Sequence, residues 1–140
     1  MSIAVDDVLL ATDADWIFDE VAAAIAGNGT RVSRVRSGSD VRAAVAELEP
    51  ALVVLDLQIG NMGGVAASID LRHEAGEERI PSTRILLLLD READAWLAEE
   101  AQADGWLIKP LDAFRLRRAA TALLAGGSWH EGVGREAQAP

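Results

Sequence analysis

The sequence alternates between short apolar runs and longer segments whose apolar residues recur at helical spacing, and this strand-then-helix order is repeated five times. The predicted strands span residues 8–12, 30–35, 51–55, 85–89 and 106–108, of which residues 30–35 are recognised by alternation and β-branched side chains rather than by an apolar run. The helical segments span residues 16–26, 39–48, 65–74, 93–103 and a last stretch after Asp112. Most of these runs are apolar throughout, which is typical of parallel strands buried on both sides. The sequence therefore predicts an α/β fold in which a five-stranded parallel sheet carries helices on both faces.

The chain has the length of about one domain, with 140 residues. We assign residues 1–125 to that domain, because the alternating pattern ends there. Residues 126–140 are rich in glycine and polar side chains, which is typical of a flexible C-terminal tail. Within the domain, Asp15 and Asp112 each stand where a carboxylate can cap the helix that follows.

The composition argues against several classes of protein. The net charge of −10 at pH 7 speaks against direct binding to nucleic acid, which needs a concentrated basic surface. No apolar run approaches the roughly 20 residues of a membrane-spanning helix, and residues 1–7 lack the basic start and apolar stretch of a signal peptide. There is no cysteine, which excludes disulfides and thiolate chemistry. We therefore expect a cytoplasmic protein without a membrane segment.

Four charged residues directly follow predicted strands, namely Asp13, Asp56, Asp90 and Lys109. In a parallel α/β sheet the carboxyl ends of the strands lie at one edge, where functional groups collect. Carboxylates and an ammonium group at such an edge could hold a divalent cation such as Mg²⁺ together with an anionic group. Lys109 is the only lysine beside twelve arginines, and its compact charge on a flexible stem suits a phosphoryl group better than a planar guanidinium does.

Three segments around these residues carry a resemblance to a known family. "VLLATDAD", "ALVVLDLQIGNMGG" and "GWLIKPLD" resemble the signature segments of the receiver domain of bacterial two-component response regulators. The resemblance covers about residues 5–125, and it is the combination of the three segments that makes it specific. It implies the flavodoxin-like (βα)5 strand arrangement of that family.

The resemblance also implies a role for each matched residue. Asp56 would be the phosphoacceptor, and Mg²⁺ would be held by Asp13, Asp56 and the backbone carbonyl of Gln58. Lys109 would pair with the phosphoryl oxygens, and its bond to Pro110 would be cis. The implied partners are a sensor histidine kinase and a downstream protein, with a possible homodimer formed through the fourth helix, fifth strand and fifth helix.

Five positions depart from the family pattern. Thr12 stands where a second acid is usual, which removes one negative charge beside the metal site. Leu89 replaces the hydroxyl residue that ends the fourth strand, and Asp90 follows it where a small residue is usual. Trp106 replaces the switching tyrosine or phenylalanine, and Gly60 replaces a common proline. These departures leave the matched Asp13, Asp56 and Lys109 in place but remove the hydroxyl–aromatic pair through which the family usually relays the signal.

Three functions therefore remain open. The first is a stand-alone receiver that is phosphorylated on Asp56 and signals through protein contacts. The second is an atypical receiver that acts as an interaction module without phosphorylation. The third is a small phosphatase, because "DADW" resembles the nucleophile motif of haloacid-dehalogenase-like enzymes. In the first two the protein is not an enzyme, apart from transfer of a phosphoryl group onto its own aspartate and slow hydrolysis of the product.

Three further tryptophans lie outside the predicted site. Trp16 and Trp96 stand at helical spacing among apolar neighbours, so we expect both to be partly buried. Trp129 lies in the predicted tail, where it could be either a docking residue or a solvent-exposed one.

Overall fold

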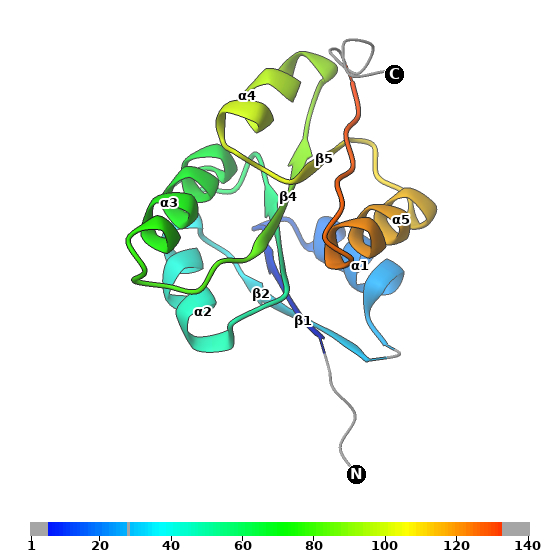
Figure 1. Cartoon of the computed structure of the whole chain (residues 1–140). Coiled ribbons are helices and arrows are strands. Elements are labelled where there is room, and N and C mark those ends of the chain that lie inside the picture. Colours follow the sequence, from blue (N-terminus) through cyan, green and yellow to red (C-terminus); the bar gives the residue numbers. More distant parts are fainter. Residues whose placement is uncertain (1–5, 28, 133–140) are drawn as a thin grey trace.

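The computed structural model describes residues 6–27 and 29–132 and contains one five-stranded parallel sheet (Figure 1). The strands are β1 (Asp6–Ala11), β2 (Thr30–Val35), β3 (Leu52–Asp56), β4 (Arg84–Leu89) and β5 (Gly105–Ile108). The α-helices are α1 (Asp15–Ile25), α2 (Val41–Leu48), α3 (Gly64–Gly76), α4 (Ala95–Glu100) and α5 (Ala113–Leu124), and the 3-10 helices η1 (Gly38–Asp40) and η2 (Glu92–Asp94) precede α2 and α4. The strand order is β2-β1-β3-β4-β5, which confirms the predicted fold class.

Helices cover both faces of the sheet. Figure 1 shows α1 and α5 on one side and α2, α3 and α4 on the other. Each face has its own hydrophobic core: Val21 and Leu116 belong to the core under α1 and α5, and Val45 and Leu71 to the core under α2 and α3. Successive strand residues point to opposite faces, so the apolar residues Leu52–Leu55 of β3 and Ile85–Leu89 of β4 supply both cores.

The strand register brings the predicted site residues to one edge. β1 pairs with β3 up to Ala11 and Leu55, so the next residues along the chain, Thr12 and Asp56, are neighbours. β4 pairs with β3 and β5, and Asp56 lies opposite Leu88 at the carboxyl end of the sheet. Because all five strands run in the same direction, the residues at their C-terminal ends lie at the same edge of the sheet.

The two predicted helix caps have different outcomes. Asp112 caps α5, since its Oδ1 accepts a hydrogen bond of 2.9 Å from the backbone N–H of Arg115. The prediction for Asp15 is wrong: the residue lies inside α1, and its carboxylate binds the guanidinium groups of Arg34 and Arg36. The helix predicted over residues 93–103 is also shorter and begins as the 3-10 turn η2.

The C-terminal segment packs against the sheet. Residues 127–132 run along β5, and Trp129 forms an isolated parallel bridge with Gly105 (Figure 1). This differs from the flexible tail expected from residue 126 onward, because side-chain contacts described below hold the segment. The rest of that predicted tail, residues 133–140, lies outside the described residues. No helix in the described ranges is both long and apolar enough to cross a bilayer.

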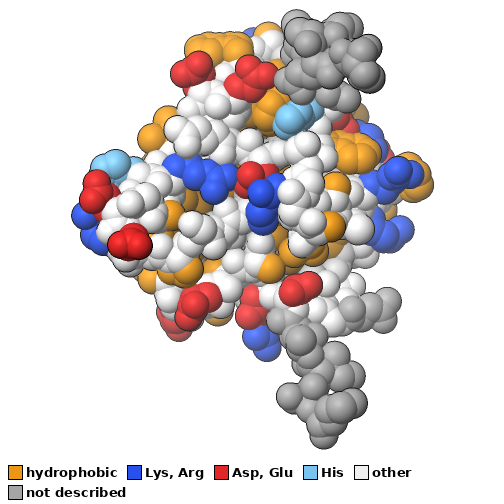
Figure 2. Space-filling view, in the orientation of Figure 1, with side chains coloured by type: hydrophobic (Ala, Val, Ile, Leu, Met, Phe, Trp, Pro, Cys, Tyr) orange, Lys and Arg blue, Asp and Glu red, His pale blue; other side chains and the backbone are white. Residues whose placement is uncertain are grey.

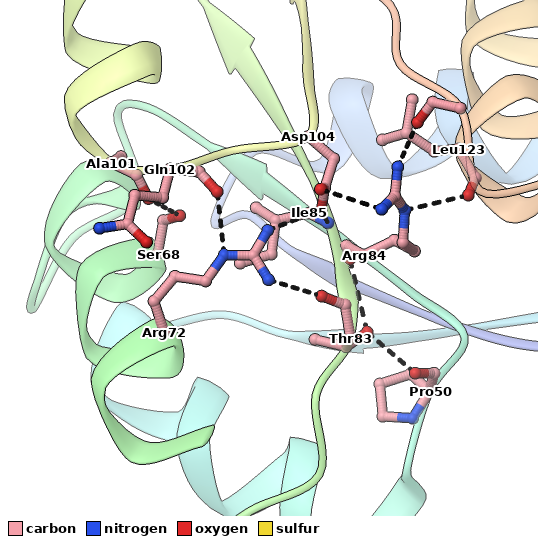
Figure 3. Close-up of polar contacts among 11 residues, drawn as sticks. Pro50, Ser68, Arg72, Thr83, Arg84, Ile85, Ala101, Gln102, Asp104 and Leu123 are labelled. Atoms are coloured by element: carbon pink, nitrogen blue, oxygen red, sulfur yellow. Dashed lines mark hydrogen bonds and ion pairs between the residues drawn. The ribbon is translucent and has the colours of Figure 1, made fainter. Parts of the chain in front are cut away.

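A second group of charged residues lies toward the amino end of β4 (Figure 3). Arg72 of α3 and Arg84 of β4 approach the carboxylate of Asp104 from either side, at 2.6 Å and 3.1 Å. Asp104 also accepts a hydrogen bond of 2.8 Å from the backbone N–H of Ile85. The cluster ties α3, β4 and the turn before β5 together, at the opposite end of the sheet from the predicted site.

Candidate functional site

Asp56 ends β3 and is almost completely buried, with 1% of its surface exposed. Lys109 Nζ donates a hydrogen bond of 2.8 Å to Asp56 Oδ1, and the backbone N–H of Gln58 donates one of 3.2 Å to the same oxygen. A buried carboxylate is stable only when it is paired and hydrogen-bonded, and here Lys109 supplies the opposite charge. The only lysine of the chain therefore contacts the predicted phosphoacceptor.

Lys109 also binds Asp90. Its Nζ lies 2.8 Å from Asp90 Oδ1, and the side-chain amide of Gln58 donates to the other oxygen of Asp90. Burial alone would lower the pKa of Lys109, but the hydrogen bonds to the two carboxylates outweigh it and the pKa of the ammonium is raised. Burial would likewise raise the pKa of Asp90, and the bonds from Lys109 and Gln58 lower it instead. The ammonium is thus shared between two carboxylates.

Thr12 completes the immediate surroundings of Asp56. Its hydroxyl donates a hydrogen bond of 2.8 Å to Asp56 Oδ2 and accepts one of 3.1 Å from the backbone N–H of Ala14. A carboxylate oxygen can accept two hydrogen bonds. Oδ1 already accepts from two groups and Oδ2 from one, so Oδ2 is the oxygen of Asp56 with remaining capacity. The neutral Thr12 occupies a position where a second acid would add negative charge.

Asp13 lies at the mouth of this site and is exposed. Its Oδ2 accepts a hydrogen bond of 3.1 Å from the backbone N–H of Gly60, a group that a proline at this position would lack. Because residue 60 is glycine instead of the proline common in the family, its N–H is available to bind Asp13.

The loop between β3 and α3 holds an unusual backbone. Asn61 and Met62 both have positive φ angles, of 52° and 78°, a region that non-glycine residues seldom adopt. Backbone bonds from Gly38 to Gly60 and from Ser39 to Asn61 fix the loop against η1. At the end of the loop the backbone of α3 approaches that of Asp56 closely: a Cβ on Gly64 would lie 2.6 Å from the Asp56 carbonyl oxygen.

The two switch positions that depart from the family pattern are both buried. Leu89 has no exposed surface, Trp106 has 3%, and both belong to the core under α2, α3 and α4. Leucine has no hydroxyl group, so at the end of β4 it offers nothing for an anionic group to bind. The cis bond between Lys109 and Pro110 is present, as the resemblance implied.

A divalent cation could be held by Asp13, Asp56 and the carbonyl oxygen of Gln58. No group of three or more His, Cys, Asp and Glu side chains suited to a metal occurs in the described ranges. Magnesium keeps several of its waters and is commonly held by one or two carboxylates. The available donors therefore fit Mg²⁺, but as a weakly held ion.

The sequence interpretation missed two polar groups of the site. It used only the backbone of Gln58, whereas the side chain binds Asp90. It treated Asp90 as a departure from the family pattern and did not foresee its ion pair with Lys109. A signal was available, because β4 and β5 were both predicted and Asp90 and Lys109 directly follow them.

Comparison with known proteins identifies the family. The family model described as "Response regulator receiver domain" matches residues 8–121, which is most of the chain. The chain belongs to the receiver domain family of response regulators. The matched range contains every residue of the site described above, from Thr12 to Lys109.

Individual relatives agree with this assignment. The receiver is 26% identical over 119 residues to protein PilH of Pseudomonas aeruginosa, covering 85% of this chain and 98% of PilH. It is 29% identical over 103 residues to the DNA-binding response regulator MtrA of Mycolicibacterium smegmatis, but spans only 43% of that protein and 74% of itself. A solved LuxR-family response regulator from Aurantimonas sp. SI85-9A1 superposes with a TM-score of 0.78 at 26% identity, over 96% of this chain and 94% of that one.

Proposed function

We propose that this receiver accepts a phosphoryl group on Asp56 from a sensor histidine kinase, with Mg²⁺ bound at Asp13, Asp56 and the Gln58 carbonyl, and passes the signal to a downstream protein. The observation that carries the proposal is the burial of Asp56 between Lys109 and Thr12. Oδ1 of this buried aspartate binds Lys109, and Oδ2 accepts only one hydrogen bond, so Oδ2 can act as a nucleophile. Lys109 can then balance the negative charge of the acyl phosphate that forms. The place of action would be the cytoplasm, with no direct contact to nucleic acid.

The proposed transfer uses groups already in place. Asp56 Oδ2 attacks the phosphorus of the donor phosphohistidine, the P–N bond breaks, and the imidazole nitrogen leaves with the electron pair and is protonated. Lys109 moves from Asp56 Oδ1 to an oxygen of the phosphoryl group and balances its charge. A bound Mg²⁺ would supply further positive charge to the phosphoryl oxygens. Attack by water on the acyl phosphate would return Asp56 slowly, and we propose no other catalysis.

One observation favours a second candidate, a receiver that acts without phosphorylation. Lys109 already binds two carboxylates, and Leu89 leaves the usual hydroxyl contact unfilled. In that case Asp90 would hold the ammonium permanently in the place of a phosphoryl group. The phosphatase alternative has less support, because Asp15, the second acid of "DADW", is bound by Arg34 and Arg36.

Mass spectrometry after incubation with Mg²⁺ and a small phosphodonor such as acetyl phosphate distinguishes these functions. The proposal expects one added phosphoryl group that hydroxylamine removes, and none in the Asp56→Asn variant or in excess EDTA. The matched control is Asp19→Asn, which removes one charge from the exposed face of α1 and should leave incorporation unchanged. The absence of a mass shift at high donor concentration would support the phosphorylation-independent function. A label on Asp13 would support the phosphatase.

A further inference from the structure

β5 is an edge strand of the sheet, and its outer side is covered by the chain's own C-terminal segment. An uncovered edge offers unpaired N–H and C=O groups to which another chain can add. Here the backbone N–H of Trp106 donates a hydrogen bond of 2.8 Å to the carbonyl of Trp129. The approach is close, since a Cβ on Gly105 would lie 2.8 Å from the same carbonyl oxygen. We call residues 127–132 the strap.

The strap holds the side chain of Trp106. The indole Nε1 of Trp106 donates a hydrogen bond of 2.7 Å to the backbone carbonyl of Glu131. The imidazole of His130 stacks on the Trp106 ring, with ring centroids 4.2 Å apart and an angle of 16° between the planes. The residue at the aromatic switch position is therefore fixed by contacts from the C-terminal segment.

Glu131 joins the strap to the end of β5 and to α5. Its Oε1 accepts hydrogen bonds of 3.0 Å from the N–H of Ile108 and 2.8 Å from the guanidinium of Arg115, and its Oε2 accepts one of 2.9 Å from the indole of Trp129. Glu131 is 19% exposed and Arg115 28%, so the ion pair is partly shielded from water. Burial would lower the pKa of Arg115, but the bonds to Glu131 and Asp112 raise it.

The beginning of the strap is fixed as well. The N–H of Gly127 donates to the carbonyl of Ala122, and Arg84 donates to the carbonyls of Leu123 and Gly127. Figure 3 shows Arg84 between Asp104 and the end of α5. In Figure 2 a histidine side chain lies beside hydrophobic side chains near the top of this face. The strap thus has anchors at both ends and a backbone bond to β5 between them.

We propose that the strap is an intrachain ligand that closes the β5 edge and has to leave before a protein partner can dock there. The partner should reproduce the contacts of the strap. It would be an extended segment that bonds to the backbone of β5, as Trp129 does, with a flat ring on Trp106 in place of His130 and a carboxylate against Arg115 in place of Glu131. Strand addition of this kind gains affinity from backbone bonds and selectivity from the side-chain contacts. This inference does not depend on phosphorylation of Asp56, and it places a built-in competitor on the face proposed for homodimer formation.

A covalently attached segment is a strong competitor. Attachment through a short connection gives an effective concentration in the millimolar range, so a free segment of the same sequence binds only when the attached one is weakened. The substitution Glu131→Ala removes the contacts to Arg115 and Ile108 while leaving the carbonyl that Trp106 uses. Glu77→Ala is the matched control, since Glu77 is exposed at the end of α3.

Hydrogen exchange of the Trp106 backbone amide is the first test. In the unmodified protein this amide should be protected, because its acceptor is the Trp129 carbonyl. Glu131→Ala should speed its exchange at least ten-fold although that acceptor is unchanged, while the Val54 amide of β3 and the Glu77→Ala protein stay as before. Free exchange of the Trp106 amide in the unmodified protein would overturn the proposal whether or not the variant folds.

Binding of a labelled peptide GSWHEG, the sequence of residues 127–132, is the second test. It should bind the Glu131→Ala protein at least ten-fold more tightly than the unmodified protein. A peptide with alanine in place of its glutamate should lose that advantage. Equal binding to both proteins, or no dependence on the glutamate, would show that the β5 edge is not a site for such a segment.

Discussion

The two ends of the sheet use the same kinds of side chain in opposite proportions. At the carboxyl end one cation, Lys109, lies between two carboxylates, Asp56 and Asp90. At the amino end one carboxylate, Asp104, lies between two guanidinium groups, those of Arg72 and Arg84 (Figure 3). The first cluster is left with an excess of negative charge and the second with an excess of positive charge.

The excess charge is matched by hydrogen-bond partners at the amino end of the sheet but not at the carboxyl end. At the amino end the remaining guanidinium donors bind carbonyl oxygens: Arg72 donates to Gln102 and Thr83, and Arg84 to Leu123. At the carboxyl end the nearby exposed Asp13 adds a further negative charge, which is the basis for the proposed cation site. A cluster whose donors and acceptors are matched supports the fold, whereas a cluster with unmatched charge next to solvent can carry chemistry.

The largest expected effect tests the structural half of this comparison. Asp104→Asn weakens both ion pairs of the amino-end cluster, so we expect unfolding to require about 1.5–3 kcal/mol less free energy. Urea denaturation followed by circular dichroism would measure it. Phosphoryl incorporation per folded molecule should be unchanged. A parallel fall in incorporation would show that the two ends are not independent.

Removing the second carboxylate from Lys109 tests the chemical half. Asp90→Asn keeps the shape of the side chain and frees the ammonium for the phosphoryl group. We expect roughly three- to ten-fold faster phosphorylation of Asp56 by acetyl phosphate. The substitution weakens the bond between Lys109 and residue 90, which stabilises the unphosphorylated protein but is absent once Lys109 binds the phosphoryl group. Time courses by mass spectrometry would show the rate, with Asp19→Asn as the control for net charge. An unchanged rate would mean that Asp90 does not compete.

A smaller effect concerns the response to the phosphoryl group. Leu89 cannot bind it and the strap fixes Trp106, so little favours a second conformation. We expect only small amide chemical-shift changes over residues 93–107 when beryllofluoride, a phosphoryl mimic, is added with Mg²⁺. Large changes there would contradict this and would point to Thr12 as the replacement hydroxyl.

The smallest effect on stability is expected at Asp13. Asp13→Ala removes the proposed metal ligand and one exposed hydrogen bond to Gly60, so the free energy of unfolding should change by no more than about 0.5 kcal/mol. Binding of Mg²⁺, which we expect at millimolar concentrations, should weaken measurably in a calorimetric or fluorescence titration. Submicromolar affinity of the unmodified protein would mean that a further ligand, most plainly Asp90, takes part.

The sheet and the site residues could be predicted because they depend on short-range patterns. Four apolar runs and one alternating segment determine the strands, and parallel strands bring Asp13, Asp56, Asp90 and Lys109 to one edge whatever the details of the loops. The resemblance to receivers added the roles and the cis bond before Pro110. Whether these roles operate stays a prediction, which the phosphorylation experiment tests.

The contacts that sequence could not supply are those between distant segments. Asp15 was predicted to cap its helix, but its carboxylate instead pairs with Arg34 at the end of β2 and with Arg36 just after that strand. Trp16 and Trp96 were expected to be partly buried and are 54% and 62% exposed, because the apolar stripes of α1 and α4 reach the core without them. Spacing along a helix shows which residues share a face, but not how far that face turns toward the core.

The placement of the tryptophans gives the protein an optical signal of its own. The chain has four tryptophans and no tyrosine, so its near-ultraviolet absorption and emission arise almost entirely from those four rings. Trp16 and Trp96 face water, whereas Trp106 and Trp129 meet at the strap. Opening of the C-terminal segment would expose Trp106 and Trp129 to water and move their emission to longer wavelength. Fluorescence would therefore report this opening without any added dye.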